Sequence, residues 1–445
     1  MNFDVLKDLI KNKKLADAKK ILIEMNEYDI ASLIEDLPIE DLIKVYRLLP
    51  KDIATDVFVN LEDTVQQELI GELTKKETKT LIEDMFTDDI VDLFEEMPAI
   101  MVTNLLGNLD KETRNTINVL LKYPENSAGS LMATEYIHLK KGLTIQESID
   151  RIKKQKDDFV SYDSCFVTDK ERKLLGTVTI KDLLINDMDT MIDDIMVECE
   201  HSINTMMDQE DVVNVFQDYN YSSLPVVDSE NRLVGIITID DIVDIMEEEA
   251  TEDMEKMAAI VPTEKPYLKL SLWDIYKSRM PWLLFLMISA TFTGAIISSF
   301  EGALAKVAVL TVFIPMIMGT GGNAGGQASV TIIRALSLGE VEFKDAIKVI
   351  FKECIVGIIC GLTLSVCNFF KLLLFDQVGW LIALVVCLAL FLTVLLAKII
   401  GALLPILADK LKLDPAVMAN PMITTIVDAG SLLVYFKVAT MLLGI

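Results

Sequence analysis

Five long apolar segments constrain this chain more than any other feature of its sequence. They lie at about 281–300, 304–333, 349–375, 379–407 and 415–441. Each is long enough to cross the roughly 30 Å hydrocarbon core of a bilayer as a helix. Residues 1 to about 275 are instead rich in charge and mostly acidic. The sequence therefore predicts a multidomain protein with a water-exposed N-terminal part and a transmembrane domain of five α-helices.

Basic residues are distributed unevenly around these segments. They lie before the first, after the second and after the fourth segment, at Lys277, Arg279, Arg334, Lys344, Lys348, Lys410 and Lys412. Because loops rich in Lys and Arg stay in the cytoplasm, the pattern predicts a multi-pass protein of the cell membrane. Its N-terminus is expected in the cytoplasm and its C-terminus on the extracellular side.

One carboxylate lies deep inside the last apolar segment. Asp428 is the only ionisable residue between Pro415 and Phe436. A carboxylate at such a depth is costly unless it meets water, a counter-charge or a cation. Asn420, Thr424 and Asp428 share one face of a helix through their i, i+4, i+8 spacing, and their oxygens suit a hard cation such as Mg2+ or Ca2+. The segment predicts an ion pathway; the alternative is a protonated Asp428 that hydrogen-bonds to another helix.

The composition argues against several classes of function. The chain has 41 Lys and Arg against 68 Asp and Glu, a net charge of −27, and such an acidic surface repels nucleic acid. Six cysteines show no Cys-x-x-Cys spacing, and the two histidines, His138 and His201, are too few for a zinc or copper site. The sequence has no nucleophile with a base, no catalytic metal spacing and no cofactor fingerprint, so an enzyme is not expected.

A run of small residues, GTGGNAGGQAS, occupies Gly319 to Ser329 in the second segment. Small residues let backbones approach closely, which favours tight helix packing or a narrow pore wall. A phosphate-binding loop is the competing interpretation, but no Lys-Ser/Thr pair follows the glycines.

The N-terminal region contains a short repeat. Apolar residues recur every twelve positions at Leu37, Leu49, Leu61, Leu73, Met85, Met97 and Leu109. Each period fits one short helix and a turn, and stacked helices of fixed length form a superhelix. An all-α superhelical N-domain is therefore expected.

A second repeat follows at an offset of 59 residues. CFVTDKERKLLGTVTIKDLL, from Cys165 to Leu184, matches LPVVDSENRLVGIITIDDIV, from Leu224 to Val243. Each copy is typical of strand, turn, strand and a capped helix. The pair resembles a tandem of CBS domains with α/β structure, which commonly sense adenine nucleotides or ions.

An acidic run, DDIVDIMEEEATEDMEKM, follows the second copy and leads into the membrane half. Solvated connecting helices often carry such charge. The position of this run next to the first span favours a regulatory role.

Four motifs lie along the chain: YPENSAGSLMATEY (Tyr123 to Tyr136), EEEATEDM (Glu247 to Met254), PMIMGTGGNAGGQAS (Pro315 to Ser329) and NPMITTIVDAG (Asn420 to Gly430). These motifs and the order of the predicted parts resemble the MgtE family of magnesium channels. The resemblance implies an N-domain at 1–127, tandem CBS domains at 128–245, a connecting (plug) helix at 246–275 and a transmembrane domain at 276–445.

The resemblance also implies a homodimer with its pore on the two-fold axis, Mg2+ entry through that pore, and closure by cytoplasmic Mg2+. Asp428 would bind hydrated Mg2+ with Asn420 near the cytoplasmic mouth, and Thr424 lies on the same face. Regulatory ions would be held by Asp56, Asp88, Asp92, Asp208, Glu210, Asp241, Asp244, Glu249, Glu252, Asp253 and Asp414. Asn220 departs from the family pattern, where an acidic ligand is expected. ATP is a candidate ligand of the CBS pair.

Two other functions remain open at this point. The first is a transporter that couples a divalent cation to protons or sodium. The second is a membrane-tethered CBS sensor without transport, although a mere anchor needs no carboxylate at mid-bilayer.

Overall fold

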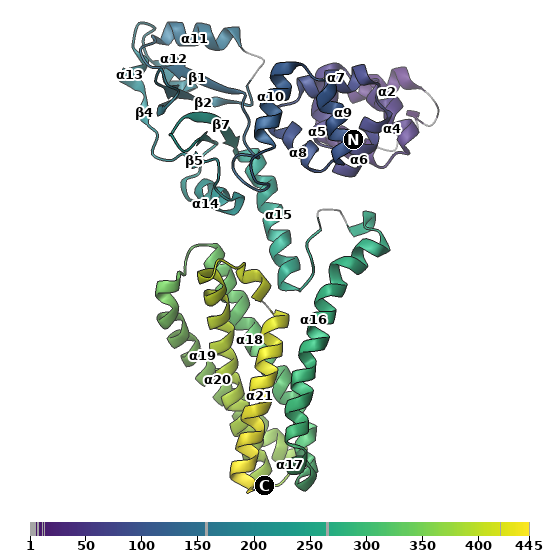
Figure 1. Cartoon of the computed structure of the whole chain (residues 1–445), viewed down its shortest axis with the longest axis vertical. Helices are drawn as coiled ribbons and strands as arrows, with labels where there is room; N and C mark the ends of the chain where they lie inside the picture. The colour runs from purple at the N-terminus through teal and green to yellow at the C-terminus, as the bar shows by residue number, and fades with distance from the viewer. Residues whose placement is uncertain are drawn as a thin grey trace. The chain divides into compact units, whose positions relative to one another are not determined.

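The computed structural model describes residues 6, 9–10, 12, 14–155, 159–263, 267–418 and 420–444 (Figure 1). The chain forms two compact units, Met1–Met246 and Glu247–Ile445.

Short helices of similar length make up the start of the first unit. They are α2 (Leu15–Leu22), α3 (Glu27–Glu35), α4 (Ile39–Tyr46), α5 (Lys51–Val59), α6 (Asp63–Glu72), α7 (Lys75–Asp84), α8 (Thr87–Glu95), α9 (Ala99–Asn108) and α10 (Lys111–Leu120). Alternate helices pack together, as α3 on α5, α4 on α6 and α7 on α9. This confirms the predicted superhelix.

The twelve-residue repeat has a clear structural origin. Its apolar residues lie in the turns after successive helices, where Leu61, Met85, Met97 and Leu109 are buried in the helical core. Each turn thus contributes one anchor to the core, which fixes both the helix length and the superhelical stacking.

Two small sheets follow, one for each copy of the second repeat. The first has the order β1 (Tyr136–Lys140), β2 (Ser161–Thr168), β3 (Leu174–Thr179) and β4 (Val197–Glu198); the second has the order β5 (Ile203–Asn204), β6 (Ser223–Val227) and β7 (Leu233–Thr238). In both sheets the first two strands are parallel and the next pair is antiparallel. The helices between strands are α11 (Ile145–Lys154), α12 (Ile180–Ile185), α13 (Ile192–Ile195) and α14 (Gln209–Tyr219).

The two copies also match in their turns and caps. Arg172 and Asn231 occupy equivalent left-handed positions, with φ 68° and 61°. Their turns contact each other, because the Leu174 amide donates to the Asn231 carbonyl and the Leu233 amide donates to the Arg172 carbonyl. The Thr179 hydroxyl donates to Asp182 and the Thr238 hydroxyl donates to Asp241 at the following helix N-termini. The predicted strand, turn, strand and capped helix is confirmed in both copies.

Helix α15 (Ile239–Met257) begins directly after β7 and continues through the acidic run. The last helix of the second CBS copy and the connecting helix are therefore one element.

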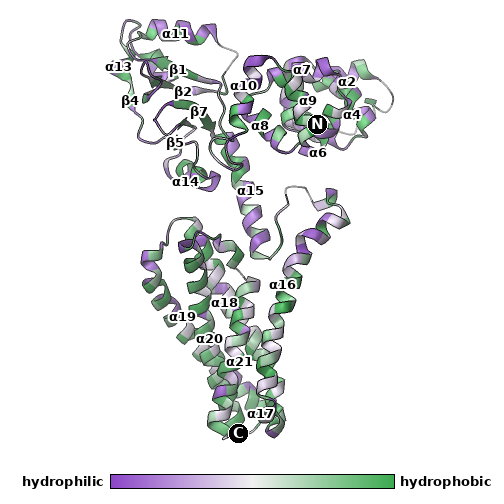
Figure 2. Cartoon of the chain, in the orientation of Figure 1, coloured by the Kyte–Doolittle hydropathy of each residue, from purple (hydrophilic) through white to green (hydrophobic). Residues whose placement is uncertain are grey.

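The second unit contains the apolar helices. Its elements are η1 (Tyr267–Lys269), α16 (Leu272–Ser299), α17 (Glu301–Lys306), η2 (Ala308–Phe313), α18 (Ile314–Ser337), η3 (Phe343–Asp345), α19 (Ala346–Leu374), α20 (Trp380–Lys410), η4 (Pro415–Met418) and α21 (Asn420–Leu443). Among the described residues, five stretches are long and apolar enough to span a membrane, which agrees with the sequence prediction. Figure 2 shows hydrophobic residues dominating α18 to α21.

The small-residue run of the second segment is part of the continuous helix α18. A Cβ added to Gly321 would lie 2.8 Å from Ser431 Oγ, and one added to Gly325 would lie 2.9 Å from Ile423 Cγ2. Both contacts are with α21, so the glycines allow α18 and α21 to pack closely. This supports the helix-packing interpretation of the motif over a phosphate loop.

Candidate functional site

Asp428 lies near the middle of α21, beside the residues that pack on α18. Its neighbour Val427 is fully buried and faces Gly321 and Gly325. Asp428 itself is half-buried, and its Oδ1 atom is buried without a hydrogen-bond partner in the described part of the chain. A carboxylate oxygen held in this way has lost hydration without gaining a donor, so a cation nearby would stabilise it.

Thr424 lies one turn before Asp428 on the same side of α21. Its Cγ2 atom is 3.0 Å from the position that a Cβ on Gly322 would occupy, which places it against α18. Asn420 begins α21, but its side chain falls outside the described residues. The structure therefore brings Thr424 and Asp428 together and leaves Asn420 as a prediction.

A cluster of carboxylates gathers where α8 lies near the start of α15, within the first unit. Burial, together with the charges of Asp241, Asp92, Asp240 and Asp56, raises the pKa of Asp89 to about 7. Burial likewise raises the pKa of Asp88, with Asp89 and Asp241 adding to the effect. These shifts show that the cluster concentrates negative charge in a poorly hydrated place.

Asp241 connects this cluster to α15. Burial raises its pKa to about 6; the Thr238 hydrogen bond opposes the shift, and the charges of Asp240 and Asp244 add to it. The cluster thus unites the predicted residues Asp56, Asp88, Asp92, Asp241 and Asp244. Sequence reasoning missed Asp89 as a member, although it adjoins Asp88 in the TDDIVDLF segment.

Asp208 and Glu210 lie at the N-terminus of α14. Asp208 caps this helix, because its Oδ1 accepts the Glu210 amide at 3.0 Å. Asn220 ends the same helix in the left-handed region, at φ 53°, where Asn is favoured over most residues. The helix end thus supplies a structural reason for Asn at position 220.

A second acidic group lies at the other end of α15, within the second unit. Asp253 has its pKa raised by burial and then by the charge of Asp414. Lys256 Nζ lies 2.7 Å from Glu252 Oε1 and 2.7 Å from Asp414 Oδ2. The structure therefore brings Glu252, Asp253 and Asp414 together, with a lysine among them.

Lys256 was not identified from the sequence. Burial alone would lower the pKa of Lys256, but its hydrogen bonds to Asp414 and Glu252 outweigh burial and raise it. The EEEATEDMEKM pattern contains the signal, since Glu252 and Lys256 have the i, i+4 spacing of a helical ion pair. The role of Asp414 has no such local signal, because it is distant in sequence.

The acidic groups have the right chemistry for a hard cation, since carboxylates are the ligands Mg2+ prefers. In the described residues, however, no three His, Cys, Asp or Glu side chains are arranged to hold a metal ion. Glu249, a further predicted ligand, is half-buried on α15. Any regulatory ion would bind by drawing these carboxylates closer together.

Another ion pair lies inside the membrane unit. Lys398 Nζ on α20 is 3.9 Å from Glu353 Oε2 on α19, and the side chains are 9% and 14% exposed. The sequence contains an indication of this ion pair, because Glu353 and Lys398 both lie within predicted spans.

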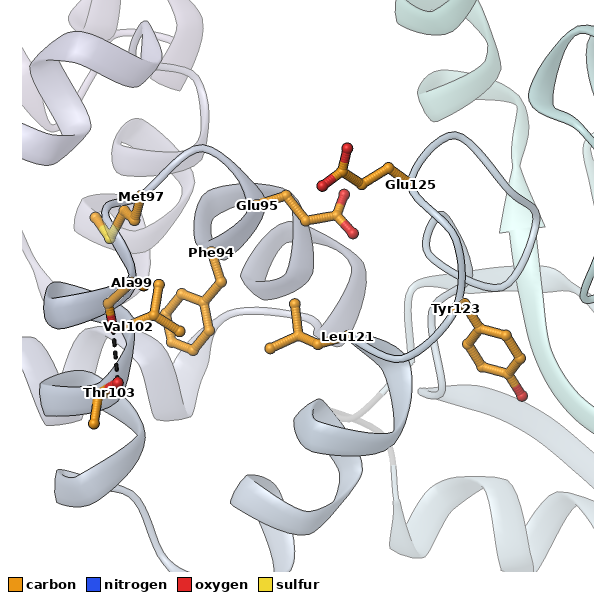
Figure 3. A pocket seen from close by; sticks show the side chains of 9 residues that line it. All are labelled: Phe94, Glu95, Met97, Ala99, Val102, Thr103, Leu121, Tyr123 and Glu125. Atoms are coloured by element: carbon orange, nitrogen blue, oxygen red, sulfur yellow. Dashed lines mark hydrogen bonds between the residues drawn. The ribbon is translucent and has the colours of Figure 1, made fainter.

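A pocket of about 510 Å³ lies in the first unit. Figure 3 shows Phe94, Val102 and Leu121 forming its apolar side and the carboxylates of Glu95 and Glu125 at its edge. Loss of hydration there raises the pKa of Glu95 to about 7, with Glu125 and Asp92 adding to the shift.

Comparison with known proteins covers the whole chain. The MgtE model, described as a divalent cation transporter, matches residues 314–438; the MgtE intracellular N domain matches 25–126; and CBS domains match 128–189 and 192–248. The chain is 36% identical to a magnesium transporter MgtE of Thermus thermophilus, over 96% of this chain and 95% of that protein. It is 32% identical to a magnesium transporter MgtE of Bacillus subtilis, over 97% and 95% of the two chains.

A solved structure is similar to the soluble part. A crystal structure of the cytosolic domain of the Mg2+ channel MgtE in complex with ATP aligns with a TM-score of 0.52 and 30% identity, covering 54% of this chain and 98% of that one.

Proposed function

The chain belongs to the MgtE family of magnesium transporters, and from this we propose that it is a Mg2+-selective channel that admits Mg2+ and is closed by cytoplasmic Mg2+. The family is one of transporters rather than enzymes. The proposal concerns how the ion crosses and how the passage is controlled.

The observation that carries the proposal is the state of Asp428. One of its oxygens is buried with no hydrogen-bond partner among the described residues, and Asp428 is the only ionisable residue between Pro415 and Phe436. A cation on the pathway would supply the missing counter-charge. Because Mg2+ gives up its water reluctantly, the ion would pass Asp428 with much of its hydration shell. Thr424 and Asn420 would line the same path.

A homodimer is the assembly that suits this site best. Two Asp428 carboxylates that face each other across a two-fold axis would repel unless a divalent cation lay between them. One carboxylate from each protomer would then give a site whose negative charge balances the positive charge of the ion.

The acidic groups support control by cytoplasmic Mg2+. Two charges 4 Å apart cost about 4 kcal/mol at an effective dielectric constant near 20, so the carboxylates that cluster around Asp89 and Asp241 favour separation when Mg2+ is scarce. Ions bound between Asp56, Asp88, Asp92, Asp241 and Asp244, near Asp208 and Glu210, and between Glu249, Glu252, Asp253 and Asp414 would favour the closed state. Mg2+ shifts the equilibrium towards the closed state only if it binds the closed state more tightly than the open one.

ATP is proposed as a ligand of the CBS pair, because the similar cytosolic domain was crystallised with ATP. Binding would be tested by calorimetry on the purified protein, and no heat of binding with millimolar ATP would contradict it.

The pore assignment is tested by Mg2+ flux into vesicles that contain the purified protein. Asp428→Asn keeps the shape of the side chain but removes its charge, so flux should fall at least about 100-fold if the carboxylate is required. Asp376→Asn, at an exposed loop position, is the matched control and should retain wild-type flux. Equal flux in wild type and Asp428→Asn would refute Asp428 as a required ligand.

Electrical recording separates a channel from a coupled transporter. A channel current reverses near the Mg2+ equilibrium potential and does not depend on a proton or sodium gradient. A current that follows either gradient would establish coupled transport instead. An absence of flux in the wild type would favour a membrane sensor.

Control by Mg2+ is tested by neutralising Asp241, Asp244 and Asp253 together. Inhibition by internal Mg2+ should then weaken, because two of the proposed ion sites lose part of their negative charge. The control neutralises Asp17, Glu112 and Glu171, which are exposed and belong to neither group. Unchanged inhibition in the first variant would remove the sensing assignment.

A further inference from the structure

The contact between α15 and the residues before α21 contains its own cation. The Lys256 ammonium donates to Glu252 on its own helix and to Asp414 ahead of η4, at 2.7 Å in both cases. The Lys256 side chain is 23% exposed and that of Asp414 is 33% exposed, so both are largely shielded from solvent. Charged hydrogen bonds in such surroundings are stronger than those on an open surface.

Asp414 is fixed on both of its oxygens. Oδ1 accepts the Ala416 amide at 2.7 Å, which holds the start of η4, and Oδ2 accepts from Lys256. These two contacts orient the Asp414 carboxylate towards α15 without a metal ion.

Apolar packing accompanies the ion pair. Met257, the last residue of α15, packs against Ile333 of α18 and Ala416 of η4, which are 3% and 1% exposed. Lys256 makes the charged contact and the next residue, Met257, makes the apolar one. Both contacts therefore require the end of α15 to lie in the same place.

A divalent ion at this contact would need the oxygens that Lys256 already holds. Glu252 and Asp414 are two of the three carboxylates gathered here, and Asp253 is the third. An ammonium group and a hydrated Mg2+ both neutralise carboxylates, but they cannot share the same oxygens without one being displaced.

We propose that Lys256 is an internal cation that takes the place of a divalent ion between Glu252 and Asp414 and holds the end of α15 against η4 when Mg2+ is scarce. This contact then needs no metal ion to form. Mg2+ acts on it only by displacing the lysine. The inference refines the proposed control by Mg2+ and rests on it for its functional meaning, but its test does not require transport.

The test measures how fast a water-soluble maleimide modifies a cysteine at Ala416, in full-length protein whose six native cysteines are replaced. Position 416 is covered by the helix end, so its reaction rate reports whether α15 is in place. In Mg2+-free buffer with chelator, Lys256→Gln should increase the rate about tenfold, since it removes two hydrogen bonds to charged groups. Lys256→Arg keeps the charge and should stay within about twofold of the parent.

Lys348→Gln is the matched control, because Lys348 is 84% exposed and pairs only with nearby Asp345 among the described residues. It should leave the rate unchanged. Adding millimolar Mg2+ should slow the reaction of Lys256→Gln back towards the parent, since the three freed carboxylates can then bind the ion. The parent should respond much less.

Two results would overturn the inference. Equal rates for the parent and Lys256→Gln in chelator would show that the apolar contact alone holds the helix end. A raised rate in Lys256→Gln that Mg2+ does not reduce would show that the lysine does not stand in for a divalent ion. Neither result depends on whether the protein is a channel or a coupled transporter.

Discussion

Lys398 and Glu353 form a buried ion pair inside the membrane unit. Lys398 lies roughly 18 Å along α20 from its C-terminal end at Lys410, and its ammonium is 3.9 Å from Glu353 Oε2. A buried ion pair gives little net stability relative to apolar residues, but removing one partner leaves an uncompensated charge.

Lys398→Met should therefore destabilise the protein by about 3–5 kcal/mol, whereas Lys398→Met combined with Glu353→Leu should be nearly neutral. The measurement is the thermal unfolding of detergent-purified protein. Lys352→Met, at the exposed position next to Glu353, is the control. If the single and double variants were equally unstable, the pair would not be the source of the effect.

At the residue scale, the sequence allowed prediction of groups that are conspicuous in their own segment. Asp428 stands out because its whole segment is apolar. Lys256 and Asp89 did not stand out, since charged residues surround both. Their roles depend on which distant carboxylates the fold brings near them, and local spacing carries no such information.

At the scale of elements, the small residues allow the membrane helices to pack closely. A Cβ on Gly401 of α20 would overlap the Gly325 carbonyl oxygen of α18. Because the obstacle is backbone rather than a flexible side chain, only a shift of a whole helix could relieve it.

Gly401→Ala should therefore cost about 1–3 kcal/mol through overpacking between α18 and α20. Gly294→Ala is the matched control, because nothing lies within 4 Å of a Cβ there and Ala favours a helix over Gly. The measurement is the fraction of detergent-solubilised protein that remains monodisperse after heating. Loss of stability in both variants would indicate that helix packing is not the cause.

Element type was predictable, but element ends were less so. The first apolar segment was placed at about 281–300, yet α16 starts at Leu272, nine residues earlier. The Ser271 and Asp274 side chains form a capping box that begins the helix in its polar part, and Pro281 lies within it. The second predicted segment is also interrupted, with α17 and η2 preceding α18. Hydropathy marks the part of a helix that faces lipid, whereas caps mark where it begins.

Orientation belongs to the whole molecule. If all five candidate helices cross the membrane, the two termini lie on opposite sides, and the basic residues near the ends of α16, α18 and α20 predict a cytoplasmic N-terminus. An epitope placed after Ile445 should be labelled by antibody in intact cells, whereas one before Met1 should need permeabilisation. The opposite pattern would reverse the orientation, and labelling of both ends in intact cells would contradict five spans.

The fold classes of the N-terminal and C-terminal parts were predictable, since acidic and apolar residues are separated along the chain. The sequence did not indicate that the last CBS helix and the connecting helix form one continuous helix, α15. The boundary between the two compact units, after Met246, falls inside α15.

This continuity has a mechanical consequence. Helix α15 has 19 residues and no Gly or Pro, so it is a stiff rod roughly 28 Å long. A tilt of about 10° at Ile239 would move its other end by roughly 5 Å, close to the pitch of one helical turn. The helix is thus a lever, which converts a small rotation near Asp241 into a displacement at Met257 large enough to separate side chains in contact.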